Sequence, residues 1–396
     1  MSESARGEGG RVWVPRKAND QRDPKEIPAE ERLYFLEEKY PRFGNLVPRD
    51  VGAREIYDIC VNQGLGVHGD MKVYLDLTHH SREFLDRRLG GILEIYEKFT
   101  GVDPREEPME IFPAVHYSMG GIWTDYTRTA DGFIDHQSPR NQMTSIEGLY
   151  DAGEADYQYH GANRLGANSL LSCIYTGLMM GPGVVNYIKN QKESATDLPS
   201  SLFDQAQQQW QEKFTGIKQM KGKENPYKLH AELSETMMSN VLIVRDNARL
   251  AATVEKIEEY DERWKDVECV DTSDWTNPVP SFVNQLYNMI QLSKVIAKGA
   301  LLRDEFRGAH YKPEFEINQP SDFKPESFLE YTKLKADGGL KQDSFKPDHL
   351  EYMRLYEESN EKWLKSSIAT FNGKGPDISY EAVDTSLIQP RPRKYD

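Results

Sequence analysis

The stretch HGANRLGANSLL at residues 160–171 joins a polar, glycine-containing loop to Leu165–Ile188, a run with no charged residue. Asn168 and Ser169 are residue types that cap helix N-termini, so we expect a helix to begin there. The run is long enough to span a membrane, but its glycines, proline and polar side chains favour a buried helix of a soluble core. The stretch therefore predicts a polar loop at the start of a buried helix.

Arg164 and this helix start form a candidate anion site. The N-terminus of a helix attracts negative charge, and the planar guanidinium suits a carboxylate or a phosphate. An ordinary cap beside a surface arginine explains the same residues equally well. Three other stretches place a cationic or titratable side chain beside glycines or in a tight loop: 6–10, 48–50 and 116–122. Three arginines and one histidine on loops suggest a dianionic substrate, although each alone is compatible with a structural salt bridge.

The N-terminal half mixes helix and strand patterns. Apolar spacing predicts helices over Ala53–Val61 and Arg82–Phe99, joined by a strand over Met71–Leu77 with period-2 alternation. Beyond residue 113 we expect short strands with glycine turns, read as the return strands of an α/β domain. They are Val115–Tyr117, Gly121–Trp123 and Gly148–Tyr150.

The C-terminal half is predicted to be mainly helical. Apolar residues recur at spacings of three and four from Leu229 to Ala251, and again from Phe282 to Ile296, which indicates a bundle of long helices. After Gly308 the chain is rich in Pro, Lys and Asp, with one further helix predicted over Asp348–Ser366.

Composition limits the class of protein. The chain has 396 residues, enough for two or three domains, and its 38% hydrophobic content with 29 glycines excludes disorder for the bulk of it. A net charge of −15 opposes binding to nucleic acid phosphates. The three cysteines are few and far apart, so we predict neither a disulfide framework nor a metal site, and a reducing compartment.

Two motifs resemble known binding sites, but we interpret neither of them as a functional site. GLGVHG at 64–69 matches the dinucleotide fingerprint Gly-x-Gly-x-x-Gly, but that fingerprint needs a strand before it and a helix after it, and here the predicted order is reversed. His79 and His80 suggest a metal site, yet adjacent residues on a strand point to opposite faces and do not easily share one ion.

Taken together, the motifs resemble the flavoprotein subunit of succinate dehydrogenase and fumarate reductase. The resemblance is carried by SESARGEGG at 2–10, VPRDVGARE at 47–55, HYSMGGI at 116–122, GLYDAGE at 148–154 and HGANRLGANSLL at 160–171. FRGAHYKPEF at 306–315 and NEKWLKSS at 360–367 extend it into the C-terminal region.

The resemblance implies a role for each matching residue. Arg49 matches the arginine that exchanges a proton with the substrate carbon, and Arg6 with Glu3 matches the relay from that arginine to solvent. His116 and Arg164 match residues that bind a substrate carboxylate, and Ser2 matches a substrate-loop hydroxyl. Flavin-contacting positions are matched by Glu154, Ser169 and Leu170, where the helix N-terminus would stabilise negative charge on reduced FAD.

The same resemblance implies an α+β multidomain fold. We expect a capping domain over residues 1–113, the C-terminal part of an α/β FAD-binding domain over 114–195, a helical bundle over 196–310 and a small C-terminal domain over 311–396. The family begins with a flavin domain that carries a true Gly-x-Gly-x-x-Gly and the histidine bonded to FAD. Neither is found here, so we expect this chain to be the C-terminal portion of such a subunit, and whether it binds FAD alone is open.

The implied partners are a dicarboxylate, an iron–sulfur subunit that passes electrons to quinone, and a membrane anchor reached through that subunit. The chain would then be a peripheral subunit on the cytoplasmic face of the cell membrane. Two alternatives stay open: an L-aspartate oxidase, which has similar motifs at 116–122 and 160–165, and a non-catalytic fragment. The residues after Arg307 favour the dehydrogenase over the oxidase.

Overall fold

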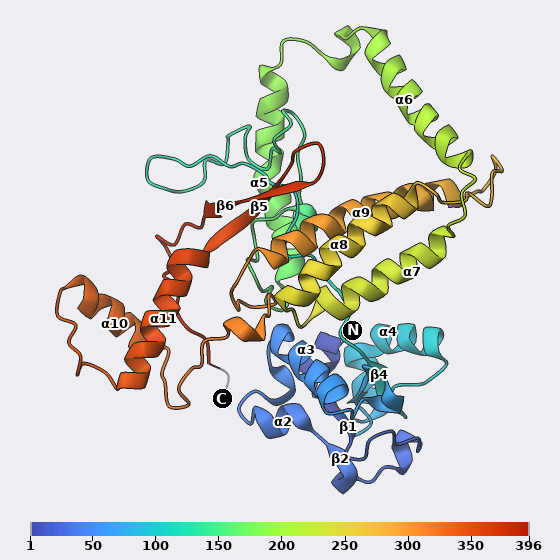
Figure 1. The fold of residues 1–396 in the computed structure, drawn as a ribbon. Coiled ribbons are helices and arrows are strands. Elements are labelled where there is room, and N and C mark those ends of the chain that lie inside the picture. The colour runs from blue at the N-terminus through green and yellow to red at the C-terminus, as the bar shows by residue number, and fades with distance from the viewer. Residues whose placement is uncertain (1, 395–396) are drawn as a thin grey trace.

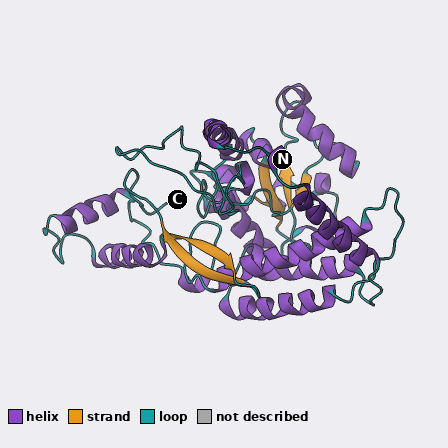
Figure 2. Ribbon diagram, turned by 90° about the horizontal axis from the view of Figure 1, so that it is seen from above, coloured by secondary structure: helices purple, strands orange, loops and turns teal. Residues whose placement is uncertain are grey.

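The computed structural model describes the backbone of residues 2–394 and the side chains of residues 4–394. Figure 1 shows the N-terminal segment below a layer of long helices, α5 standing upright behind them, and the C-terminal helices to one side. Within the described residues, strands form a small sheet in the N-terminal segment and a hairpin near the C-terminus (Figure 2). The predicted α+β class is confirmed.

The N-terminal segment is built on an antiparallel sheet in the order β2-β1-β3-β4. Its strands are β1 Arg11–Pro15, β2 Arg32–Leu33, β3 Val73–Asp76 and β4 Met109–Ile111, and its helices are α1 Ser2–Gly7, α2 Phe35–Lys39, α3 Arg49–Tyr57 and α4 Arg82–Thr100.

The predicted helix over Arg82–Phe99 is confirmed as α4. Its start is capped by the Ser81 side chain, which accepts a hydrogen bond from the Phe84 amide, and it ends at Gly101 in the left-handed conformation with φ +77°. Leu85, Leu89 and Leu93 recur every four residues and are buried in the same core as the sheet. Val51 and Ile56 of α3 are buried in this same core, which fixes the position of α3.

Residues 114–167 are largely irregular, which corrects the prediction of three short strands there. Ile122 forms one isolated bridge with Asp156, and Tyr150 forms one with Met143, without continuing into strands. The side chains of Val115 and Ile122 are exposed.

The uncharged run forms α5, Asn168–Asn190, but the prediction that this helix is buried is wrong for much of its surface. Its buried face is formed by Ser172, Thr176, Met179 and Gly183. The opposite face exposes large apolar side chains, among them Leu171, Ile174 and Leu178. None of the described helices combines the length and apolar character needed to cross a membrane.

The predicted long-helix bundle is present. It contains α6 Ser200–Lys218, α7 Pro226–Met237, α8 Asn247–Trp264 and α9 Val279–Leu301, with α6 extending away from the other three (Figure 1). A shared core of leucine, isoleucine and valine side chains includes Leu233, Ile257 and Leu286. The helical path is interrupted between α7 and α8. The Asp246 side chain caps the start of α8 by accepting a hydrogen bond from the Arg249 amide.

The C-terminal segment has its own aromatic core around Phe323, Phe328 and Tyr352. It contains α10 Glu326–Ala336, α11 Pro347–Trp363, and the hairpin β5 Lys365–Phe371 with β6 Pro376–Ala382. Of these, only α11 was predicted. Separate cores are in keeping with several domains, while the four boundaries stay predictions.

Short helical turns complete the element list. They are 3₁₀ turns at Pro24–Glu26, Ala29–Glu31, Gly44–Leu46, Val67–Gly69, Gly153–Ala155, Ala195–Asp197 and Pro313–Phe315, and π turns at Asp58–Asn62 and Met238–Leu242.

The glycine motif at 64–69 follows a helix and precedes β3, the reverse of a dinucleotide fingerprint, as predicted. A Cβ on Gly66 would lie 1.8 Å from the Asp70 carbonyl oxygen, so this glycine serves a tight turn. His79 and His80 lie on a turn after β3 with ring centroids 4.0 Å apart. The expectation that they sit on a strand and point to opposite faces is therefore wrong.

Candidate active site

Arg49 is the first residue of α3, directly after Pro48. Three residues later, the same helix carries Gly52, which is buried. A Cβ on Gly52 would lie 3.3 Å from an Arg6 guanidinium nitrogen, Nη1, so the absence of a side chain leaves room for Arg6 against the first turn of α3. The structure thus brings two of the predicted site arginines to the same helical turn.

Arg6 projects from α1 into a poorly solvated position. Its Nε atom is buried and has no hydrogen-bond partner among the described residues. Burial lowers the pKa of the Arg6 guanidinium below its usual value. Ser2 and Glu3 belong to the same helix, but their predicted roles concern side chains that lie outside the described residues.

Arg164 is buried within the polar loop before α5. Its guanidinium donates to the Leu165 carbonyl oxygen at 3.1 Å and lies 5.1 Å from the centre of the Tyr117 ring. The Tyr117 hydroxyl lies 3.2 Å from Ser172 Oγ, which is also 3.1 Å from His160 Nε2. The loop at 116–122 and the first turns of α5 therefore hold Arg164 between them.

Three predicted site residues share one electrostatic environment. Burial and the charge of Arg164 lower the pKa of the Arg49 guanidinium. Burial and the charges of Arg49 and Arg164 lower the pKa of His116. Cationic groups that raise one another's energy in this way favour binding of an anion that neutralises them. This electrostatic environment favours a small molecule with more than one negative charge.

The start of α5 differs from the prediction. Its N-cap position is Ala167, in the left-handed conformation with φ +63°, and no side chain caps the helix. The expected capping role of Asn168 and Ser169 is therefore wrong, because both residues already lie inside the helix. As a result, the first-turn amides are free of side-chain caps and remain suited to an external anionic group.

Glu154 lies on the turn that packs beside α5. Its Oε1 accepts a hydrogen bond from the Ser118 amide at 2.9 Å, which ties the loop at 116–122 to this turn. Gly153 has φ +84°, and a Cβ there would lie 3.1 Å from Cys173 Sγ. Leu170 exposes 73% of its surface at the first turn of α5. Uncapped amides beside an exposed apolar side chain fit the polar edge and the flat face of a flavin ring.

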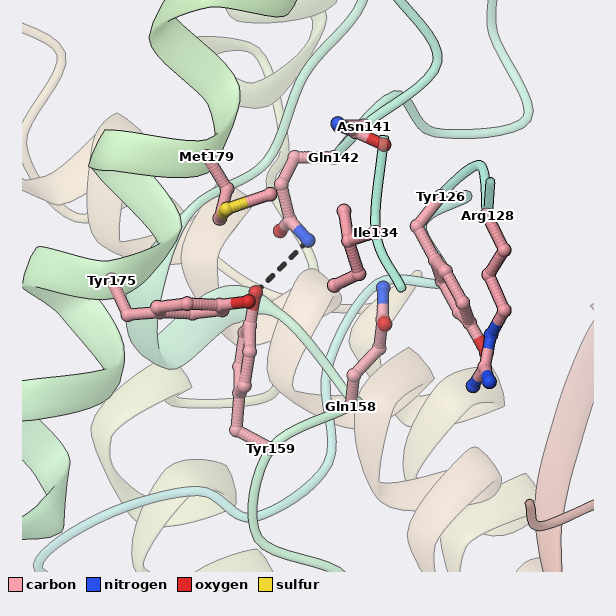
Figure 3. A pocket seen from close by; sticks show the side chains of 9 residues that line it. All are labelled: Tyr126, Arg128, Ile134, Asn141, Gln142, Gln158, Tyr159, Tyr175 and Met179. Carbon is pink, nitrogen blue, oxygen red and sulfur yellow. Dashed lines mark hydrogen bonds between the residues drawn. The ribbon is translucent and has the colours of Figure 1, made fainter. Parts of the chain in front are cut away.

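A separate cavity of about 150 Å³ lies between α5 and the irregular segment before it. Figure 3 shows its lining, in which Gln142 donates to the Tyr159 hydroxyl at 3.0 Å. Close by, burial raises the pKa of the Asp156 carboxyl to about 6. None of the predicted site residues lines this cavity, so it is distinct from the arginine cluster.

Sequence reasoning left three residues of this region without a role: Asp50, Asn163 and Tyr117. Asp50 and Asn163 each adjoin a site arginine and lie hydrogen-bonded to each other at 3.0 Å. The motifs at 47–55 and 160–171 contained both, but nothing in a single sequence indicates a pairing between residues so far apart.

Comparison with known families agrees with this geometry. A family described as FAD binding domain matches residues 1–170, and one described as fumarate reductase flavoprotein C-term matches residues 230–395. These matches define a FAD-binding flavoprotein, with FAD as its cofactor. More narrowly, the chain belongs to the family of flavoprotein subunits of succinate dehydrogenase and fumarate reductase.

Individual relatives support this assignment. The chain is 46% identical over its whole length to the succinate dehydrogenase flavoprotein subunit of Bacillus subtilis, covering 56% of that protein. It is 27% identical to the fumarate reductase flavoprotein subunit of Haemophilus influenzae, again covering all of the chain and 56% of the relative. The chain thus spans about half the length of the curated relatives it matches.

Solved structures resemble the fold over most of the chain. A quinol fumarate reductase with menaquinol molecules aligns with a TM-score of 0.67 at 26% identity, covering 98% of this chain and 57% of that one. The Mycobacterium smegmatis Sdh1 complex aligns with a TM-score of 0.55 at 28% identity, covering 80% of this chain and 46% of that one.

Proposed function

We propose that this chain supplies the dicarboxylate-binding and proton-transfer residues of an enzyme that interconverts succinate and fumarate. The observation that carries the proposal is the convergence of Arg49, Arg164 and His116, whose charges and burial lower the pKa values of Arg49 and His116. A four-carbon dianion has two carboxylates for these groups and places its central carbons between them.

In this proposal Arg164 and His116 bind the substrate carboxylates. Arg164 is held rigidly by its bond to the Leu165 carbonyl and by the Tyr117 ring, so it is oriented before the ligand arrives. His116 is more exposed and accepts a proton more readily once a carboxylate offsets the neighbouring arginines. Ser2 would add a hydroxyl donor.

Arg49 would act as the acid in fumarate reduction and as the base in succinate oxidation. A guanidinium normally keeps its proton, but burial and the charge of Arg164 both favour its release from Arg49. Arg6, next to the same helical turn, would restore that proton, with Glu3 leading to solvent. When bound, FAD supplies the acceptor or donor for the hydride.

The flavin ring would meet the start of α5. The uncapped amides around Ser169 would stabilise negative charge on the reduced ring, Leu170 would contact its face, and Glu154 would brace the loop beneath it. The whole enzyme would pass electrons to an iron–sulfur subunit and then to quinone. It would attach to the cytoplasmic face of the membrane through an anchor subunit.

The test uses the holoenzyme, prepared with FAD. Addition of succinate without oxygen should bleach the flavin absorbance, whereas L-aspartate should not. Bleaching by L-aspartate alone would identify the oxidase instead. Absence of stoichiometric flavin absorbance after FAD is added to the purified chain would favour the non-catalytic alternative. Arg87→Ala, a substitution of an exposed residue on α4, is the control variant, and succinate should bleach its flavin as it does in the unmodified protein.

A further inference from the structure

A buried carboxylate lies one residue from the proposed proton donor. The Asp50 side chain is 0% exposed and sits in the first turn of α3. Its Oδ1 accepts from Asn163 Nδ2 at 3.0 Å, and its Oδ2 accepts from Arg393 Nη2 at 3.0 Å and from Arg54 Nη1 at 3.4 Å. A charge removed from water in this way is tolerated only because these partners replace its hydration.

The partners of Asp50 come from three separate parts of the chain. Arg54 lies on the same helix, Asn163 precedes Arg164 in the polar loop, and Arg393 lies in the C-terminal tail. We call these four residues, Asp50, Arg54, Asn163 and Arg393, the Asp50 junction. One carboxylate therefore joins the backbone that carries Arg49 to the backbone that carries Arg164.

A second set of contacts braces the junction. Arg54 Nη1 also donates to the Gly308 carbonyl oxygen at 3.0 Å, and the Ala309 amide donates to the Ala162 carbonyl oxygen at 2.8 Å. Gly308 has φ +58°, and a Cβ there would lie 2.5 Å from the Ala162 carbonyl oxygen. The loop at 307–310 is thus pressed against the loop of Arg164, and Arg54 holds it to α3.

The C-terminal tail is anchored on its other side. Gln319 Nε2 donates to the Arg393 carbonyl oxygen at 3.2 Å, and Lys394 Nζ donates to the Ser321 carbonyl oxygen. Arg393 is therefore fixed by its backbone to the segment before α10 while its guanidinium reaches Asp50. The tail connects the C-terminal segment to α3 at the point where Arg49 begins the helix.

We propose that the Asp50 junction is a positioning device that sets the separation of Arg49 and Arg164, and so selects the chain length of the dicarboxylate. Within the junction, Arg393 connects the C-terminal tail to Asp50. The inference rests on the proposed function and adds to it the residues that fix substrate length. None of the four residues is assigned a contact with substrate; each acts through its neighbour.

The effect of removing the contact between Arg393 and Asp50 follows from this arrangement. Without Arg393, the Asp50 carboxylate keeps Asn163 and Arg54 but loses its shortest contact to an arginine. Arg49 and Arg164 then sample a wider range of separations, so ligands shorter or longer than four carbons bind relatively better. Discrimination should fall more than overall affinity.

The experiment measures competitive inhibition of succinate oxidation by malonate and glutarate, which are one carbon shorter and one carbon longer, in the full-length holoenzyme. Arg393→Ala should reduce the preference for succinate over both ligands by about tenfold, as expected when reacting groups lose their alignment. Arg393→Lys, which keeps the charge, should restore part of it. Arg391→Ala, an exposed change on the same tail, should leave the preference unchanged.

The Asp50→Asn variant supplies a coupled test. Because both substitutions break the same contact, the double variant should lose no more discrimination than the worse single variant. An Arg393→Ala enzyme that loses thermal stability but keeps wild-type discrimination would overturn the inference. If the unmodified holoenzyme shows no succinate-dependent activity, the proposed function fails rather than the junction. Arg393 is partly exposed, so its variants test the inference even if Asp50→Asn fails to fold.

Discussion

Gly52→Ala should separate the stability of the chain from its catalytic function. Position 52 lies inside α3, where alanine is favoured over glycine by about 1 kcal/mol. The new methyl group would lie 3.3 Å from Arg6 Nη1 and 3.8 Å from Val47 Cγ2. Arg6 meets the methyl group with the far end of a flexible side chain, so it moves by a few tenths of an ångström at little cost.

The expected result is a more stable but slower enzyme. The free energy of unfolding should stay equal or rise by up to about 1 kcal/mol, since the helix gains propensity. Turnover of succinate should fall by about tenfold, because Arg6 is displaced from the turn that carries Arg49. Urea denaturation of the chain measures the first quantity, and steady-state kinetics of the full-length holoenzyme measure the second.

Gly91→Ala provides the matched control. Gly91 lies in the middle of α4, and a Cβ there has no neighbour within 4 Å. Stability should rise by a similar amount, with turnover unchanged. Wild-type turnover in the Gly52→Ala enzyme would refute the placement of Arg6 in the proton path.

Two further predictions concern pH. The pKa of His116 is lowered by burial and by the charges of Arg49 and Arg164, so a bound dicarboxylate should raise this pKa and bind together with a proton. The affinity for succinate should therefore increase as the pH falls. His116→Gln should abolish this pH dependence. His310 is neutral in the fold, where burial and Arg245 lower its pKa to about 3, against about 6.5 when unfolded. Its contribution to stability is complete above pH 6.5 and is lost as the pH falls toward 3, at up to roughly 1.4 kcal/mol per pH unit. Urea titrations of the chain at several pH values should show that the free energy of unfolding changes less steeply with pH in His310→Gln than in the unmodified chain. An unchanged dependence on pH would contradict this prediction.

Elements whose apolar face finds a partner within the chain were predictable. The four-residue repeat of leucines identified α4, and the periodic pattern from Phe282 identified α9, because each packs into a core formed by described residues. The burial of α5 was predicted from its lack of charge and its glycine and polar content, and this prediction failed because Ser172, Thr176 and Gly183 pack inward while large apolar side chains of the opposite face are exposed. Hydrophobicity alone does not reveal which face of a uniformly uncharged helix is covered.

The candidate site was only partly accessible from sequence. Motif resemblance identified Arg49, Arg164 and His116, and the structure places these residues in one electrostatic environment. Asp50 was passed over although it adjoins Arg49, because its role depends on Asn163 and Arg393, more than one hundred positions away. Contacts at that separation depend on the fold and leave no local pattern in the sequence.

The most direct test of the central claim is to measure flavin reduction and ligand binding together in the Arg49→Ala enzyme. If Arg49 carries the proton, flavin reduction by succinate should fall by about a thousandfold or more, as general acid–base catalysis is lost. Affinity for fumarate should change far less, because Arg164 and His116 still hold the carboxylates. Near-normal reduction of the flavin by succinate in this variant would contradict the account.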